Sequence, residues 1–280
     1  MNIKITSDST CDLPQELISK YNITITPLSV IKNDEAFKDG LDIHPADIFA
    51  HVAAGGALCS TSAGSVGDYE DIFTHLAKEN DAVIHISLGS GFSSSYQNAC
   101  LAASDFGNVY CVDSMNLSAG QGLIVLKAAE LAAAGMEPQK ILETLNAFVP
   151  KVESSFLVDK LDYLVKGGRC SSAAALGANL LNLKPCIEVK DGKMSVVKKY
   201  RGNYAKCLAT YIKDRLEGRE DIDRSTGFLI KTVVSDDCYN AVMDAVNSCE
   251  AFENFYDAIA GCTISCHCGP GTLGVLFVRK

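Results

Sequence analysis

Tryptophan is absent from this chain of 280 residues, and proline occurs only 7 times. Basic residues are also scarce, since 25 Lys and Arg stand against 34 Asp and Glu, which gives a formal net charge of -9 at pH 7. The low proline content argues against a collagen-like or low-complexity chain. Because phosphate backbones and anionic membranes attract basic surfaces, the charge argues against binding to nucleic acid or to a lipid surface.

Long apolar runs are missing as well. The most apolar window, residues 117–135, is interrupted by Gln121, Lys127 and Glu130, so it is too polar to span a bilayer. Residues 1–6 have the pattern of a first strand and lack the basic head and cleavage site of a signal peptide. These features predict a cytoplasmic protein without stable membrane insertion. In that compartment, the 12 cysteines are expected to be reduced thiols that act as small buried hydrophobes.

The first half of the chain alternates strand-like and helix-like segments. Apolar or alternating patterns predict strands at 3–6, 23–26 with its continuation 28–31, 82–86 and 109–112. Helical spacing of apolar residues predicts helices at 45–53, 66–78, 93–104, 123–134 and 137–148. This order is typical of a mainly parallel sheet flanked by helices, so we predict an α/β fold with an N-terminal domain over residues 1–150.

The second half has a different pattern. Asp191-Gly192 separates two alternating segments, 187–190 and 193–197, which is the signature of a type I′ hairpin. Further strands are expected at 156–158, 228–234, 255–260 and 275–278, with helices at about 204–217 and 237–248. We therefore predict a C-terminal α+β domain with antiparallel pairing over residues 151–280.

Two loops are rich in small hydroxyl residues, at 60–65 and at 87–95. The second follows the strand at 82–86, and ligands of open α/β sheets bind beyond the carboxyl ends of strands. Helix N-termini and hydroxyls there can hold an anion without a formal positive charge. Capping and turn formation explain the same composition, and that alternative stays open.

The loop at 87–95 also matches part of the glycine motif that binds dinucleotides. Gly89 and Gly91 follow a strand and open a helix, and Asp113 lies at the end of the next strand, but Ser94 occupies the position of the third glycine. An oxidoreductase that binds a nicotinamide or flavin cofactor through this loop is therefore the alternative function. A serine-dependent acyl hydrolase and a scaffold without a small ligand are weaker alternatives, and the chain contains no G-x-S-x-G elbow.

Cys262, Cys266, His267 and Cys268 have the appearance of metal ligands, but they do not have the spacing of a structural zinc site. If residues 264–268 are extended, His267 points away from the two neighbouring cysteines. We therefore expect no metal. Two basic turns, 166–169 and 198–202, are either solvated loops or docking sites for an acidic partner.

Six motifs in order resemble those of the DegV family, which includes the fatty-acid-binding subunits of bacterial fatty acid kinase. The family patterns are D-S-T-x-D-L, T-S-Q-P-S, S-S-x-L-S-G-T-Y, D-S-x-x-x-S-x-G-x-G, K-G-G-R and H-x-G-P-G-x-x-G. Their counterparts here lie at 8–13, 61–65, 89–96, 113–122, 166–169 and 267–274. The resemblance spans essentially the whole chain.

The resemblance implies a two-domain protein that encloses one long-chain fatty acid between its domains and presents it to a kinase subunit for conversion to an acyl phosphate. It implies that Thr61, Ser93 and His267 bind the carboxylate, with Ser62 and Ser94 nearby, and that Arg201 engages the kinase. No cofactor and no catalytic residue are implied, because the chemistry belongs to the kinase. Two departures from the family pattern stand beside these residues. Ala63-Gly64 is expected to loosen its loop, and Ser94-Ser95 to add bulk near the head group.

Overall fold

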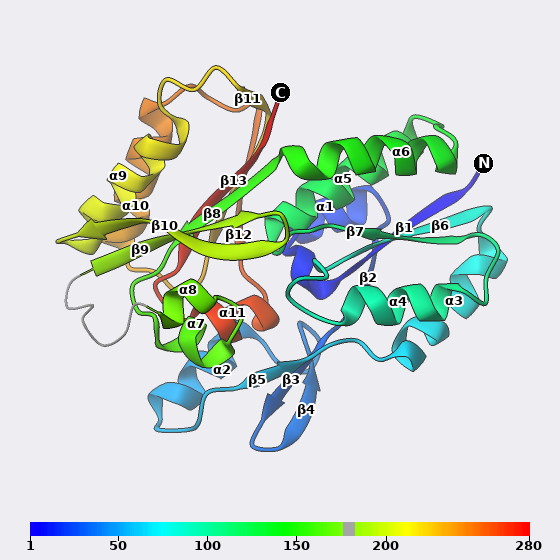
Figure 1. Cartoon of the computed structure of the whole chain (residues 1–280), viewed down its shortest axis with the longest axis horizontal. Coiled ribbons are helices and arrows are strands. Elements are labelled where there is room, and N and C mark those ends of the chain that lie inside the picture. The colour runs from blue at the N-terminus through cyan, green and yellow to red at the C-terminus, as the bar shows by residue number, and fades with distance from the viewer. Residues whose placement is uncertain (176–182) are drawn as a thin grey trace.

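A parallel sheet lies at the centre of the N-terminal half of the computed structural model, which describes residues 1–175 and 183–280 (Figure 1). Its strands run in the order β2-β1-β6-β7, and every neighbouring pair is parallel. They are β1 (Ile3–Asp8), β2 (Thr24–Thr26), β6 (Ala82–Ser87) and β7 (Val109–Asp113). The predicted sheet is therefore confirmed, and the chain leaves β1 toward one edge and β6 toward the other.

Helices cover both faces of this sheet, because its apolar strands must be buried on both sides. On one face lie α3 (Val66–Glu79) and α4 (Ser95–Ala103), and on the other lies α5 (Ala119–Ala133). The outer helix α6 (Pro138–Phe148) packs against α5, and α1 (Gln15–Lys20) follows the 3-10 helix η1 (Ser9–Cys11).

A six-stranded sheet of order β10-β9-β8-β13-β11-β12 forms the second half, with only the β11–β12 pair parallel. Its strands are β8 (Val152–Leu157), β9 (Leu183–Lys190), β10 (Lys193–Arg201), β11 (Ile222–Lys231), β12 (Asn254–Ile259) and β13 (Leu273–Arg279). Helices α9 (Tyr204–Leu216) and α10 (Asp236–Ser248) pack together on its outer side. The predicted hairpin is confirmed, and Asp191 and Gly192 have the positive φ angles, 50 and 70 degrees, that a type I′ turn needs.

Helix α5 is the centre of the main core, because it contacts β1 and β6 of one sheet and β8 and β13 of the other. A helix packed on both sides must be apolar all round, and Leu123, Ile124 and Val125 are all buried. The core thus joins the two halves of the chain. The domain division near residue 150, where the 3-10 helix η2 (Val149–Lys151) lies, remains a proposal.

A small antiparallel sheet of order β4-β3-β5 lies below the larger elements in Figure 1. Its strands are β3 (Ser29–Lys32), β4 (Glu35–Lys38) and β5 (Ser60–Ser62), and α2 (Pro45–Ala53) lies between β4 and β5 in the chain. The predicted continuous strand from 23 to 31 is wrong, because the chain passes from the parallel sheet to the small one at Pro27. A proline cannot donate to a sheet ladder, which favours a break there.

Three short helices complete the described part of the chain: α7 (Asp162–Gly167), α8 (Ser171–Ala174) and α11 (Cys262–Cys268). Residues 264–268, for which an extended conformation was considered, belong to α11. Among the described residues, no helix is long and apolar enough to cross a membrane. Nine of the 12 cysteines are buried, and all are free thiols.

Candidate functional site

A pocket opens at the carboxyl edge of the parallel sheet, beyond the ends of β2, β6 and β7, beside the point between β1 and β6 where the strand order reverses. Ligands of open α/β sheets bind in this crevice. The loop after β6 contributes Leu88, Phe92 and Ser93 to the pocket, and α11 of the C-terminal half contributes Ile264, His267 and Cys268. The pocket encloses about 540 Å³, its mouth included.

The pocket brings together four residues singled out in the sequence. Thr61, Ser62, Ser93 and His267 all line it, although they come from three distant segments. The remaining lining residues are Leu28, Ala63, Leu88, Phe92, Leu117, Arg169, Met194, Thr263, Ile264 and Cys268. The site is therefore a small group of hydroxyls and one imidazole surrounded by apolar side chains.

The hydroxyl of Thr61 lies 2.8 Å from Nε2 of His267, which joins β5 to α11. Nδ1 of His267 is buried without a hydrogen-bond partner among the described residues. A Cβ added to Gly167 would lie 2.4 Å from this nitrogen, so only glycine leaves room for the ring. Burial, together with the positive charge of Arg169, lowers the pKa of His267 to about 4, so the imidazole is neutral at pH 7.

Two aspartate side chains from the N-terminal half hold the first turn of α11 in place. Asp39 accepts from the backbone N–H groups of Cys262 and Thr263 at 2.9 and 3.0 Å, and Asp12 accepts from that of Gly261 at 2.9 Å. Acceptors at a helix N-terminus satisfy N–H groups that have no partner within the helix. These contacts fix the position of the helix that bears His267.

Ser93 is oriented by the first turn of α4. Its Oγ accepts the backbone N–H of Ser95 at 3.1 Å and lies 2.9 Å from the Ser95 hydroxyl. Ser95 lies next to the Tyr69 hydroxyl, which donates to Asp8 at 2.7 Å. Since Ser95, Tyr69 and Asp8 are all completely buried, Ser93 stands at the end of a rigid polar network.

Asp8 is charged at the inner end of this network. Burial acts to raise its pKa, but hydrogen bonds and the neighbouring His85 outweigh burial and hold the pKa below its usual value. Its Oδ2 accepts from the Leu88 backbone N–H at 2.7 Å and from the Ser87 hydroxyl at 2.8 Å. The same carboxylate therefore anchors the start of the loop that carries Ser93.

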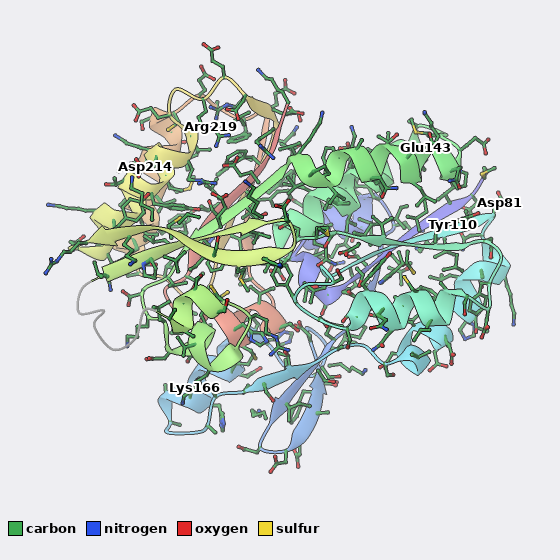
Figure 2. All side chains as sticks on the ribbon, viewed as in Figure 1. Asp81, Tyr110, Glu143, Lys166, Asp214 and Arg219 are labelled. Carbon is green, nitrogen blue, oxygen red and sulfur yellow. The ribbon has the colours of Figure 1, made fainter. Side chains whose placement is uncertain are left out.

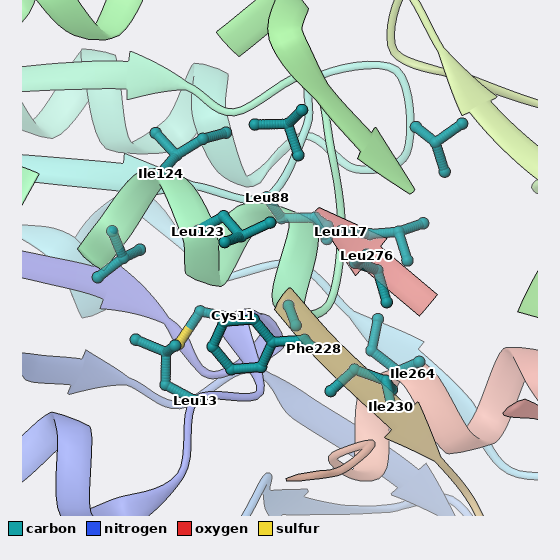
Figure 3. Close-up of a cluster of buried hydrophobic side chains, with 14 of the residues drawn as sticks. Cys11, Leu13, Leu88, Leu117, Leu123, Ile124, Phe228, Ile230, Ile264 and Leu276 are labelled. Carbon is teal, nitrogen blue, oxygen red and sulfur yellow. The ribbon is translucent and has the colours of Figure 1, made fainter. Parts of the chain in front are cut away.

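A second, almost wholly apolar slot lies deeper and shares Leu117, Ile264 and Cys268 with the pocket. It spans about 370 Å³, its opening to solvent included, between α11 and the six-stranded sheet. Figure 3 shows Leu117, Ile230, Ile264 and Leu276, four of its lining residues, close to one another.

Hydroxyl groups also line this slot, but most of them donate their protons to other groups of the protein and not to an occupant of the slot. Ser118 donates to Asp12, Thr232 to the Gly269 carbonyl, and Thr272 to the Cys268 carbonyl. Because these protons are already used, the slot presents mainly hydrocarbon to an occupant.

Arg169 was missed as a site residue, although the basic turn 166–169 was visible in the sequence. It lines the pocket and donates to the carbonyls of Gly167 at 2.8 Å and Phe92 at 3.4 Å. Lys166 of the same turn points to the surface (Figure 2). The expectation of a site without a fixed positive charge is therefore wrong, and the K-G-G-R pattern was the signal.

The other predicted residues lie outside the pocket. Ser94 is exposed, and neither Ser94 nor Ser95 lines the pocket. Arg201 is exposed at the end of β10. It lies seven residues, or about 20 Å, along the strand from Met194 of the pocket wall.

The loop containing Ala63-Gly64 has defined anchors. The Asn98 side chain donates to the Gly64 carbonyl at 2.8 Å, and Ser65 caps α3 together with Asp68. A Cβ on Gly64 would lie 2.8 Å from the ring of Tyr69. Glycine at this position therefore allows the loop to pack closely on the buried tyrosine.

Gly89 and Gly91, which suggested a dinucleotide-binding loop, pack closely against the backbone of other loops. A Cβ on Gly89 would lie 2.8 Å from the Asn116 nitrogen, and one on Gly91 would lie 2.1 Å from the Gly192 carbonyl oxygen. Asp113 accepts from the backbone N–H groups of Ser90 and Met115 at 3.0 and 2.9 Å. These contacts account for the Gly89, Gly91 and Asp113 pattern without a cofactor.

The cysteines of α11 point in different directions. Cys262 and Cys266, one helical turn apart, pack in an apolar cluster with Cys59, whereas Cys268 belongs to the main core. Burial raises the pKa of all three thiols, that of Cys268 to about 12. Within residues 1–175 and 183–280, no group of three or more His, Cys, Asp or Glu side chains is arranged to hold a metal ion.

The family model described as "Uncharacterised protein, DegV family" matches residues 2–280. A DegV domain-containing protein of Caldanaerobacter subterraneus is 33% identical over 282 residues, which cover 99% of each chain. A solved structure described as "Fatty Acid Binding of a DegV family Protein from Thermus thermophilus" aligns over both full chains, with a TM-score of 0.90 and 30% identity. "DegV, a fatty acid binding protein from Bacillus subtilis" also aligns over both full chains, with a TM-score of 0.82 and 27% identity. The chain thus belongs to the DegV family.

Proposed function

We propose that this protein binds one long-chain fatty acid and presents its carboxylate to a partner kinase. The observation that carries the proposal is the pocket in which Thr61, Ser93 and His267 meet, next to an apolar slot. The fatty acid binding of the Thermus thermophilus and Bacillus subtilis relatives supports it. A nicotinamide or flavin oxidoreductase receives no support from these relatives, and the glycine loop is explained by packing.

Proton positions at the head group follow from the neutral His267. With its Nδ1 facing the α-carbon of Gly167, the imidazole carries its proton on Nε2 and donates it to the Thr61 hydroxyl. The Thr61 hydroxyl proton is then free to bond a carboxylate oxygen. The Ser93 hydroxyl rotates to donate to the same head group, and Arg169 adds a positive charge at the mouth. A carboxylate held in this way keeps its hydrogen bonds on leaving water.

The tail supplies most of the binding energy in this proposal. Burial is worth roughly 0.8 kcal/mol per methylene, so a tail of about fourteen carbons contributes on the order of 11 kcal/mol before costs. Ordering the chain and losing rigid-body freedom remove several kcal/mol. Affinity should therefore rise steeply with chain length until the slot is full.

A thermal-shift panel with palmitate, oleate, octanoate, NAD and FAD tests the ligand class. Because a ligand that binds the native state raises the melting temperature, the two long acids should stabilise the protein and the dinucleotides should not. Ile264, which lines both the pocket and the slot, provides the variant. Ile264→Trp should abolish the shift by oleate, whereas the control Ile264→Val should keep it. Stabilisation by NAD or FAD but by neither long acid would contradict the proposal.

Presentation to a kinase is the second part of the proposal. The pocket is open at its mouth, so a carboxylate bound by Thr61 and Ser93 faces outward, and the sequence resemblance assigns Arg201 to the partner contact. About 20 Å of strand separates Arg201 from the pocket wall, so Arg201 acts on docking rather than on the acid.

Binding and phosphorylation can be separated with Arg201→Ala. Oleate affinity should stay at the wild-type value, while ATP-dependent formation of acyl phosphate by a fatty acid kinase catalytic subunit should fall at least about tenfold. Lys193→Ala, at the opposite end of the same exposed strand, is the matched control and should keep both. Loss of oleate binding in Arg201→Ala would refute this assignment.

A further inference from the structure

A second and wider pocket lies beside the first turn of α4 and the end of β7. It encloses about 1230 Å³, its mouth included, between β7, the β9–β10 turn and the region around Pro150. Tyr96 of α4 and Cys111 of β7 both line it. Its wall therefore contains a thiol that small solutes can reach.

A second thiol lies beside Cys111. Cys100 is one helical turn after Tyr96 on α4, so the two side chains share a face, and α4 packs directly on β7. Cys100 and Cys111 are partly exposed, in contrast to the nine buried cysteines. Cys111 packs against the apolar cluster that contains Ala99 and Ala103, which stand on either side of Cys100 in α4, and both Cys111 and Tyr96 act on the Cys100 thiol.

These contacts make the two sulfurs chemically different. The neighbouring Cys111 side chain lowers the pKa of Cys100 to about 6 against the opposing effect of burial, and Tyr96 adds to the lowering. The neighbouring Cys100 side chain and burial raise the pKa of Cys111. An accessible thiolate next to a second, protonated thiol is the arrangement found in redox-sensing cysteine pairs.

We propose that Cys100 and Cys111 form a reversible disulfide when the protein meets a peroxide. The Cys100 thiolate attacks one peroxide oxygen, the O–O bond breaks, and Cys100 becomes a sulfenic acid while the second oxygen leaves and takes a proton to form water. The Cys111 sulfur then attacks the Cys100 sulfur, the S–O bond breaks, and a second water leaves with the Cys111 proton. Two thiols are oxidised and one peroxide is reduced to two waters.

The disulfide would tie together the two elements that frame the loop at 87–95. Helix α4 begins at Ser95, whose N–H bonds to Ser93. Strand β7 ends at Asp113, which accepts the N–H of Ser90. Oxidation therefore acts next to the fatty acid site without touching the pocket itself.

The chain offers a direct readout by mass spectrometry. No Lys or Arg lies between 79 and 126, so both thiols fall in one tryptic peptide, 79–127, which contains no other cysteine. The protein is treated with excess hydrogen peroxide, its thiols are blocked with N-ethylmaleimide, and it is digested. We expect the peptide to have lost two hydrogens and to carry no maleimide. If dithiothreitol is added before the blocking step, both thiols are restored and the peptide carries two maleimides. Oxidation of Met115 in the same peptide adds the mass of one oxygen, so it is distinguished by mass from disulfide formation.

Two variants and one internal control sharpen the result. Cys111→Ser should accumulate a sulfenic acid on Cys100 that dimedone traps, whereas Cys100→Ser should leave Cys111 fully alkylated. Cys59 and Cys266 also lie together but are buried with raised pKa values, so they should remain reduced. Recovery of the wild-type peptide with two maleimides, at a peroxide dose that oxidises a free-thiol peptide, would overturn the proposal. Oxidation of the Cys59–Cys266 pair before the Cys100–Cys111 pair would also overturn the proposal.

Discussion

Thr61 and His267 stand 206 positions apart in the chain, yet the threonine hydroxyl lies 2.8 Å from Nε2 of the imidazole. The contact joins β5 of the small sheet to α11 of the C-terminal half, at the wall of the pocket. The proposed head-group site therefore exists only when both halves of the chain are folded around the main core.

Replacing Thr61 with valine keeps the shape of the side chain and removes the hydroxyl. Nε2 of His267 then loses its partner, and a bound carboxylate loses one donor, so binding of oleate should weaken by roughly 1–3 kcal/mol, or about fivefold to 150-fold. Calorimetric titration measures the effect. Thr210→Val on the exposed face of α9 makes the same change far from the site and should bind oleate normally. Equal affinity in Thr61→Val and wild type would remove Thr61 from the site.

Gly167→Ala should weaken binding through the position of His267. The added Cβ lies 2.4 Å from Nδ1, so the ring must move and its bond to Thr61 is strained or lost. We expect at least about a tenfold loss of oleate affinity, since a lost buried hydrogen bond costs about 1–3 kcal/mol.

The matched control for this change is Gly107→Ala, where a Cβ meets nothing within 4 Å. That variant should keep wild-type affinity. If Gly167→Ala also binds oleate at wild-type strength, His267 does not act on the head group.

The low pKa of His267 predicts how stability depends on pH. Its ordinary value is 6.5, and in the folded protein burial and Arg169 lower it to about 4. Between these values the unfolded chain binds more protons, so protonation favours unfolding. The contribution of His267 is fully present above about pH 6.5 and is lost as the pH falls toward 4, and it amounts to about 1–3 kcal/mol.

Urea unfolding of wild type and His267→Gln at pH 7, 6, 5 and 4 measures this contribution. Asp12 acts in the opposite direction, because burial raises its pKa from 3.8 to about 8, so its stabilisation falls as pH rises through this range. Asp12 is present in both proteins and cancels in their difference. The difference in unfolding free energy between the two proteins should therefore change with falling pH only through His267. A difference that stays constant from pH 7 to 4 would contradict the lowered pKa of His267.

Local signals in the sequence predicted much of the fold correctly. Asp191-Gly192 requires two positive φ angles, a property of the residues themselves, and the hairpin stands where it was expected. The helix at Pro45–Ala53 likewise begins at its proline and was predicted to the residue. Such features depend on neighbours in the chain and are therefore visible in the sequence.

The errors arose where distant residues decide the structure. Helix α11 is short and rich in cysteine, and it is held at its first turn by Asp12 and Asp39, more than two hundred positions earlier. No local pattern contains that information. Arg169 belongs to a basic turn that the sequence shows, but only the packing of that turn beside Phe92 and His267 brings it to the pocket.

Native mass spectrometry of the protein purified without added ligand tests the central claim most directly. The account predicts a bound species with the mass of one long-chain fatty acid, which exchanges for oleate when oleate is supplied and is absent from Ile264→Trp. A protein that carries no ligand and gains no mass in the presence of oleate or palmitate would contradict it.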